Sequence, residues 1–260
     1  MKISNKKQKS TSIKFRGGAE VKAGELKPDG ATTKLIALAQ QEPDLFHDAM
    51  DDAYATIGIN GHHETMLVKS HAFRVFLGWK FFRSEGRAAQ PQAVTAALHT
   101  LEAMALYDKP EKKVHSRIAH EDGAIYLNLA DCKRRIVRIT SQEWSIVPSA
   151  QASVKFCIHK GMKPLPEPVR NGTLDRLRAL VNVSDTDWPL YIGFALGCFR
   201  ERGPFPILAL LGGWDAGKTT GASVVKKLID PSDPTGAGAR SVTAPDIGGS
   251  LAPHASSGPA

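Results

Sequence analysis

Apolar residues in the first 110 or so positions recur at the spacing of helices. The segment 33–41 (TKLIALAQQ) predicts a short amphipathic helix that Pro43 ends. A second helix is expected over 70–85, because a serine can cap its first turn and Gly86 can end its last one. Pro91 is typical of a first helical position and opens a third helix.

Further along, the apolar period changes to two, which is the period of strands. Residues 114–119 alternate in this way, and the Asp-Gly turn at 122–123 leads into a strand at 124–131 (AIYLNLAD). Two more strands are expected at 135–140 and 144–147. The first part of the chain therefore predicts an α+β module of two or three helices followed by an antiparallel meander.

The second half begins with three prolines at 164–168, which predict a linker. A helix is expected at 174–181, followed by an apolar helix at 188–199 that is too short to cross a membrane and suits a buried core. The continuous apolar run at 206–211 (PILALL) predicts a parallel strand buried on both faces. Residues 219–230 then predict a helix with one apolar side.

Between the last strand and helix, residues 212–219 (GGWDAGKT) match the phosphate-binding P-loop pattern. In such a loop, backbone N–H groups cradle phosphate oxygens, Lys218 reaches the β- and γ-phosphates and Thr219 ligates Mg²⁺. The expected cofactors are therefore ATP and Mg²⁺, and a plain glycine-rich turn is the alternative. The candidate nucleotide-binding residues are Gly212, Gly213, Trp214, Asp215, Ala216, Gly217, Lys218, Thr219 and Thr220.

Two side chains of this loop are unusual for a phosphate site. The Asp215 carboxylate should point outward, away from phosphate charge, and the bulky Trp214 should cover the site or pack on the sheet. Hydrolysis also needs a second, acidic strand, and nothing after Thr220 fits one. The upstream run 124–131 ends in an acid but alternates as a hairpin strand does, so we expect no catalytic residue in this chain.

Charge is concentrated at the N-terminus of a chain whose net charge is +8. One glutamate, Glu20, accompanies seven cations in the first 22 residues: Lys2, Lys6, Lys7, Lys9, Lys14, Arg16 and Lys22. Such a basic arm attracts polyanions such as DNA, or is simply a solvated tail. We expect no signal peptide, because the basic N-terminus lacks an apolar segment, and no membrane span. The three cysteines lie far apart, so a cytoplasmic protein without a membrane partner is expected.

Other patterns predict less. A winged-helix DNA reader is an alternative for the first module, but its would-be recognition helix, 91–107, has no lysine or arginine. The preceding helix does carry cations, at Arg74, Lys80 and Arg83. The histidines at 62, 63, 115 and 120 lack the spacing and partners of a zinc site, so we expect them on the surface.

Several stretches resemble a family of P-loop ATP-binding proteins of bacteria, phages and other mobile elements, similar to the helicase part of phage and plasmid primase–helicases. The resemblance covers roughly residues 33–231 and is carried by LIALAQQEPDLFHDAMDDAYATI, HHETMLVKSHAFRVFL, DGAIYLNLAD, KPLPEPVRNG and RGPFPILALLGGWDAGKTT. It implies a DNA-linked ATPase, and a possible homo-oligomer where the full ATPase core is present. The resemblance carries over only Gly212, Gly217, Lys218 and Thr219 as site residues.

Family members continue past the P-loop with an acidic strand, whereas the likeness here stops near Asp230. The segment 231–260 is rich in Pro, Gly, Ser and Ala, a composition that cannot bury enough surface to fold. We expect a truncated chain in which a frameshift or early stop replaced the rest of the core, with a genuine short nucleotide-binding protein as the alternative.

The fold class expected is α/β: an N-terminal α+β module followed by the start of a P-loop NTPase core with an incomplete parallel sheet. The expected parts are a disordered basic arm (1–32), the α+β module (33–163), a linker, helices and strand–loop–helix (164–230), and a disordered or aberrant tail (231–260). The function expected is ATP binding without useful hydrolysis. The rival is a non-enzymatic nucleic-acid or protein adaptor with a degenerate loop.

Overall fold

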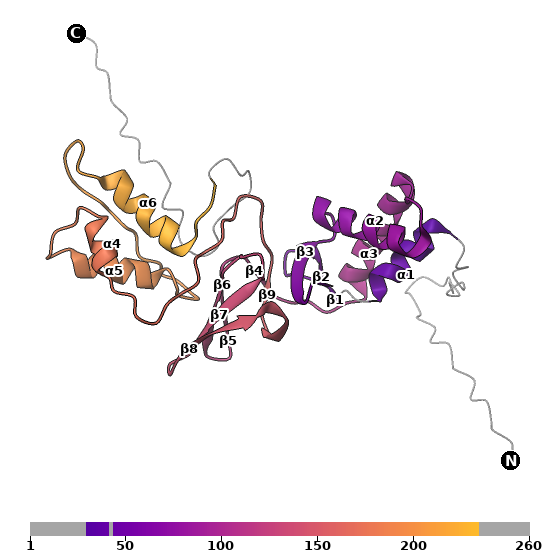
Figure 1. The fold of residues 1–260 in the computed structure, drawn as a ribbon, viewed down its shortest axis with the longest axis horizontal. Helices are drawn as coiled ribbons and strands as arrows, with labels where there is room; N and C mark the ends of the chain where they lie inside the picture. Colours follow the sequence, from indigo (N-terminus) through magenta and orange to yellow (C-terminus); the bar gives the residue numbers. More distant parts are fainter. Residues whose placement is uncertain (1–29, 42–43, 234–260) are drawn as a thin grey trace, which may run out of the picture.

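The computed structural model describes residues 30–41 and 44–233, which form a mixed α/β protein (Figure 1). Three groups of elements follow one another along its long axis: a helix-rich module, a β-meander and a second set of helices. Residues 1–29 of the basic arm and 234–260 of the tail lie outside the described residues. Residues 231–233, the start of the expected tail, are described, and they bond to 161–163 through the Pro231 carbonyl and the Asp233 N–H. Across the described part of the chain, no helix has the length and apolar character needed to span a bilayer.

The first module combines three helices with a three-stranded antiparallel sheet of order β1-β2-β3. Its elements are α1 (Ala31–Gln40), β1 (Asp44–His47), β2 (Ala53–Ile59), β3 (His62–Leu67), α2 (His71–Glu85) and α3 (Pro91–Tyr107). The three predicted helices are confirmed within two or three residues at each end. Local signals set both ends of α2, because the Ser70 hydroxyl accepts a hydrogen bond from the Phe73 N–H and Gly86 ends the helix in the left-handed conformation.

The apolar pattern misses the sheet of this module. Strand β2 is buried at five consecutive positions, so its two faces do not alternate in polarity. The hairpin between β2 and β3 turns at Asn60 and Gly61, whose φ angles are 48° and 83°. An Asn-Gly pair with both φ angles positive is the tight turn that strand twist favours, and it is the sequence signal that could have revealed the sheet.

The meander is a four-stranded antiparallel sheet of order β5-β6-β7-β8, as the period of two predicted. Its strands are β5 (Ile118–Glu121), β6 (Ala124–Asn128), β7 (Arg135–Ile139) and β8 (Trp144–Pro148), and the short helix η1 (Ser149–Gln151) follows them. The expected strand at 114–119 is divided, because β4 (Val114–His115) pairs in parallel with β9 (Lys155–Phe156). Asp122 and Gly123 make the predicted turn, with φ angles of 50° and 72°.

The last group contains α4 (Asp175–Ala179), α5 (Trp188–Gly197) and α6 (Lys218–Ile229), all three anticipated from the sequence. The strand expected at 206–211 is wrong: this segment joins no ladder with any other described residue. A strand needs a neighbour to satisfy its backbone groups, and the described strands nearby pair only within the meander. Leu208 and Leu210 instead pack against α5 and α6, so the parallel sheet of a P-loop core is not seen in the described part of the chain.

The prolines at 164–168 run alongside the meander. Leu165 is buried, and its N–H donates to the Leu129 carbonyl at 2.8 Å. The side chain of Leu165 packs against Leu129 and Val137. This segment is therefore fixed to the sheet at its middle.

A buried arginine joins the meander to the end of α6. The Arg117 side chain is 1% exposed, and its Nε donates to the Asp230 carboxylate at 2.8 Å. Its other nitrogens donate to three backbone carbonyls, those of Asn128, Lys163 and Pro231. Asp230 caps the C-terminal end of α6, where a carboxylate opposes the helix dipole unless a cation neutralises it. Arg117 thus fixes where α6 ends.

We expect Arg117→Ala to lower the free energy of unfolding by about 3–5 kcal/mol, because it takes the guanidinium donor from the partly buried Asp230 carboxylate and from the carbonyls of Asn128 and Lys163. Urea denaturation followed by circular dichroism measures the loss. Lys69→Ala is the matched control: it also removes one member of an ion pair, with Glu102, but the Lys69 side chain is 71% exposed. Equal losses in the two variants would contradict a structural role for Arg117.

Candidate functional site

The predicted phosphate-binding loop forms a tight turn directly before α6. Gly217 is the residue before the helix and has a φ of 74°, a left-handed conformation that suits glycine. A side chain at Gly212 would lie only 3.0 Å from the Ala216 Cβ, so the loop closes on itself too tightly for one. Asp215 is also left-handed, with a φ of 56°. Residues 212–217 therefore form the turn that leads into α6.

Lys218, the first residue of α6, lies across this loop. Its ammonium group donates to the Gly212 carbonyl at 3.0 Å and to the Gly213 carbonyl at 2.6 Å. Lys218 is also the single cation in the sequence 212–220. The only positive side chain in 212–220 therefore contacts the backbone of the first two glycines of the loop.

Helix α5 and the residues before it brace the loop from behind. The Asn182 amide donates to the Ala216 carbonyl at 3.2 Å, and the buried Tyr191 hydroxyl donates to the Gly221 carbonyl at 2.8 Å. A Cβ on Gly221 would be 3.3 Å from the Leu210 side chain, so α6 approaches the 206–211 segment closely here. Sequence reasoning missed Asn182 and Tyr191, because no spacing links them to the loop.

The side chains of the loop are arranged with their polar groups in solvent. Asp215 is exposed, as expected for a carboxylate near a phosphate site. Trp214 is 99% exposed, so the expectation that it packs on a sheet is wrong, since no described sheet lies beside it. The alternative, that Trp214 covers the site, stays a prediction. Thr219 and Thr220 are exposed in the first turn of α6, and their hydroxyls are accessible to a ligand.

An open cleft of about 820 Å³ lies between α5 and the 206–211 segment. Its apolar lining includes Leu190, Ile207 and Leu211, which are 73%, 87% and 94% exposed. Exposed apolar surface of this kind is uncommon on a soluble domain. The cleft adjoins the loop at 212–220, since Leu211 directly precedes Gly212.

A scan against protein-family models and searches of curated proteins and solved structures returned no match to this chain. The assignment of the site therefore depends on the residues of the loop and on its geometry.

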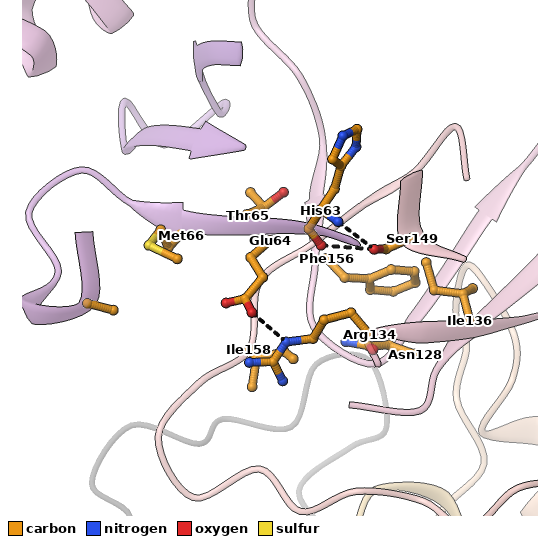
Figure 2. A pocket seen from close by; sticks show the side chains of 11 residues that line it. His63, Glu64, Thr65, Met66, Asn128, Arg134, Ile136, Ser149, Phe156 and Ile158 are labelled. Atoms are coloured by element: carbon orange, nitrogen blue, oxygen red, sulfur yellow. Dashed lines mark hydrogen bonds and ion pairs between the residues drawn. The ribbon is translucent and has the colours of Figure 1, made fainter. Parts of the chain in front are cut away.

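A second hollow, of about 170 Å³, lies at the junction between the first module and the meander (Figure 2). The Arg134 guanidinium donates to the Glu64 carboxylate at 3.1 Å, across the hollow. On the far side, the Ser149 hydroxyl accepts from the His63 N–H and donates to the His63 carbonyl. These polar groups are hydrogen-bonded to one another. The hollow is therefore better explained as a joint between the first module and the meander than as a ligand site.

Glu64 is the central charge of this joint. Burial raises the pKa of its carboxyl, but hydrogen bonds from His62 and Arg134 outweigh burial and hold the pKa below its usual value. The ionised carboxylate is therefore better stabilised in the folded chain than in the unfolded one. Its contribution to stability is present above the pKa of an unfolded glutamate and is lost as the pH falls through the lower, folded pKa.

Histidines and cysteines offer no metal site within the described residues, where no three His, Cys, Asp or Glu side chains gather. The prediction that His115 and His120 lie on the surface is wrong, because both are partly buried. The His120 Nε2 donates to the Phe199 carbonyl at 2.7 Å, and burial lowers the pKa of His115. Burial also raises the pKa of the Cys157 thiol to about 11, so this thiol stays protonated.

We expect Glu64→Gln to flatten the acid dependence of stability. Between about pH 6 and about pH 3, wild type should lose the Glu64 contribution while the glutamine variant has none to lose, so their unfolding midpoints converge. Urea denaturation at a series of pH values measures this. Glu143→Gln, on an exposed turn, is the control and should track wild type. A constant gap between wild type and Glu64→Gln would contradict the ion-pair account.

Proposed function

We propose that this chain binds ATP together with Mg²⁺ through the loop at 212–220. The observation that carries the proposal is the pairing of a left-handed Gly217 with Lys218, whose ammonium group is folded over the loop. The loop opens onto the N-terminal end of a 12-residue helix, where unpaired N–H groups and the helix dipole favour an anion. Glycines, lysine and helix start together form a cradle suited to phosphate.

Each residue of the loop would have its own part in binding. The N–H groups of the loop and of the first turn of α6 would hold phosphate oxygens. Lys218 would exchange its two carbonyl partners for the charge of the terminal phosphates, and the Thr219 hydroxyl would hold the metal ion. Mg²⁺ would neutralise phosphate charge. Asp215, exposed in solvent, would stay clear of the phosphates.

The proposal is for binding, with no acid assigned to hydrolysis. The upstream run 124–131 ends at Asp131, whose carboxylate accepts hydrogen bonds from the Arg135 backbone and guanidinium. Burial raises the pKa of Asp131, but these bonds outweigh it and hold the pKa below its usual value. Asp131 follows a strand of the antiparallel meander and is engaged in its turn. The family resemblance implies a DNA-linked ATPase. We assign that activity to the family only, and propose ATP binding alone for this chain.

We expect Lys218→Ala to weaken ATP binding by about 10- to 100-fold, because it removes a charge-assisted hydrogen bond to phosphate. Isothermal titration of the full chain with ATP and Mg²⁺ measures the affinity. Lys227→Ala, an exposed lysine in the last turn of the same helix, is the matched control and should bind as wild type does. Absence of binding by wild type, or equal binding by Lys218→Ala, would sink the proposal and favour an adaptor.

Thr219→Val should remove most of the gain in affinity that Mg²⁺ provides and leave metal-free nucleotide binding nearly unchanged. The substitution keeps the shape of the side chain and deletes only its hydroxyl. Titrations with ATP, with and without Mg²⁺, separate the two quantities. Ser223→Ala removes a hydroxyl one turn further along α6 and serves as the control. If Thr219→Val retains the full Mg²⁺ effect, the metal ligand has been assigned to the wrong residue.

A further inference from the structure

Helix α2 carries an exposed aromatic stripe on the side that faces away from the core of its module. Val75, Trp79 and Phe82 are 54%, 53% and 54% exposed. Their spacing of three and four residues aligns them along one side of the helix. The other side is buried through Phe73, Phe76, Leu77 and Phe81. The stripe is therefore additional to the apolar surface that the fold itself uses.

Two arginines flank the stripe. Arg74 and Arg83 are exposed at its two edges, and neither is in an ion pair with another described residue. The Arg83 guanidinium lies 6.0 Å from the centre of the Trp79 ring. The one carboxylate of α2, Glu85, is already paired with Lys34 at 2.8 Å. The surface is consequently both cationic and aromatic.

The Trp79 ring of the stripe is held in place by the helix and its core. Trp79 contacts Phe76 with 6.2 Å between ring centres, and Phe76 is 9% exposed. The helix beneath them is capped at both ends, by Ser70 and Gly86. A ligand that stacks on Trp79 would therefore lose little free energy in ordering its ring.

We infer that the α2 surface, made of Arg74, Val75, Trp79, Phe82 and Arg83, binds single-stranded nucleic acid. Unpaired bases stack on exposed aromatic rings, and arginines beside the rings neutralise the phosphates. A duplex keeps its bases stacked inside and would leave the rings unused. A membrane or an apolar protein partner suits the surface less well, because the stripe is narrow and both arginines would lose water without a counter-charge. This inference does not depend on nucleotide binding at 212–220.

The test is a fluorescence-anisotropy titration of the full chain with labelled oligothymidylate and oligouridylate of about 20 nucleotides, longer than one binding site. Wild type should bind, with affinity that falls as salt rises. The double variant Trp79→Ala/Phe82→Ala should bind about tenfold or more weakly, since each stacked base depends on a ring. Trp79→Phe keeps a ring and should retain most of the affinity. Arg74→Gln/Arg83→Gln should weaken binding and make its salt dependence shallower.

Two controls separate the α2 surface from other sites. Tyr107→Ala removes an 85% exposed ring at the end of α3 and should bind as wild type does. Lys6→Gln/Lys7→Gln/Lys9→Gln neutralises part of the basic N-terminal arm and should lower affinity without abolishing the effect of the ring variants. Urea denaturation checks that each variant is folded.

Three outcomes would overturn the inference. The first is wild type that binds neither oligonucleotide. The second is binding that survives the loss of both rings, or of both arginines, and disappears when the arm is neutralised. The third is binding of wild type to vesicles of anionic phospholipid in place of oligonucleotides, which would make α2 a membrane-facing helix.

Discussion

The Arg117–Asp230 ion pair is the constraint on which the position of the candidate site depends. A guanidinium buried to 1% exposure is costly unless its nitrogens are hydrogen-bonded, and each Arg117 nitrogen donates to the Asp230 carboxylate or to a carbonyl from one of three segments. The same contact neutralises the carboxylate at the C-terminal end of α6. Because α6 is rigid, anchoring its C-cap, Asp230, to the meander also sets where its first residue, Lys218, lies.

The N-terminal end of α6 is positioned by contacts of a different kind. Tyr191 and Asn182 hold the first turn and the loop by hydrogen bonds to carbonyls. Further along the helix, Val225 and Ile229 pack on α5 and the meander. The loop is therefore preformed without a parallel sheet behind it. The apolar segment 206–211, which would be a buried strand in a complete core, instead leaves an open cleft beside the loop. In the described structure, helices support the loop that we propose as a nucleotide cradle.

The sequence predicted features that local physics determines and missed those that depend on distant partners. Caps at Ser70 and Gly86 and the Asp122-Gly123 turn are local signals, and the elements beside them are confirmed. The first sheet was missed because β2 is buried on both faces and gives no alternation. The strand at 206–211 was wrong because pairing needs a neighbouring edge, which no local pattern reports. In the same way, the motif identified Lys218 and Gly217, whereas Arg117, Asn182 and Tyr191 act through contacts 30 or more residues away in sequence.

The central claim is that the loop before α6 is a preformed nucleotide cradle. Hydrogen–deuterium exchange of the full chain, with and without ATP and Mg²⁺, tests it most directly because it identifies the backbone amides that the ligand protects. The account predicts slower exchange of backbone amides within 212–221 on adding nucleotide, with the first module unchanged. Unchanged exchange at the loop at saturating ATP, or protection confined to another part of the chain, would contradict it.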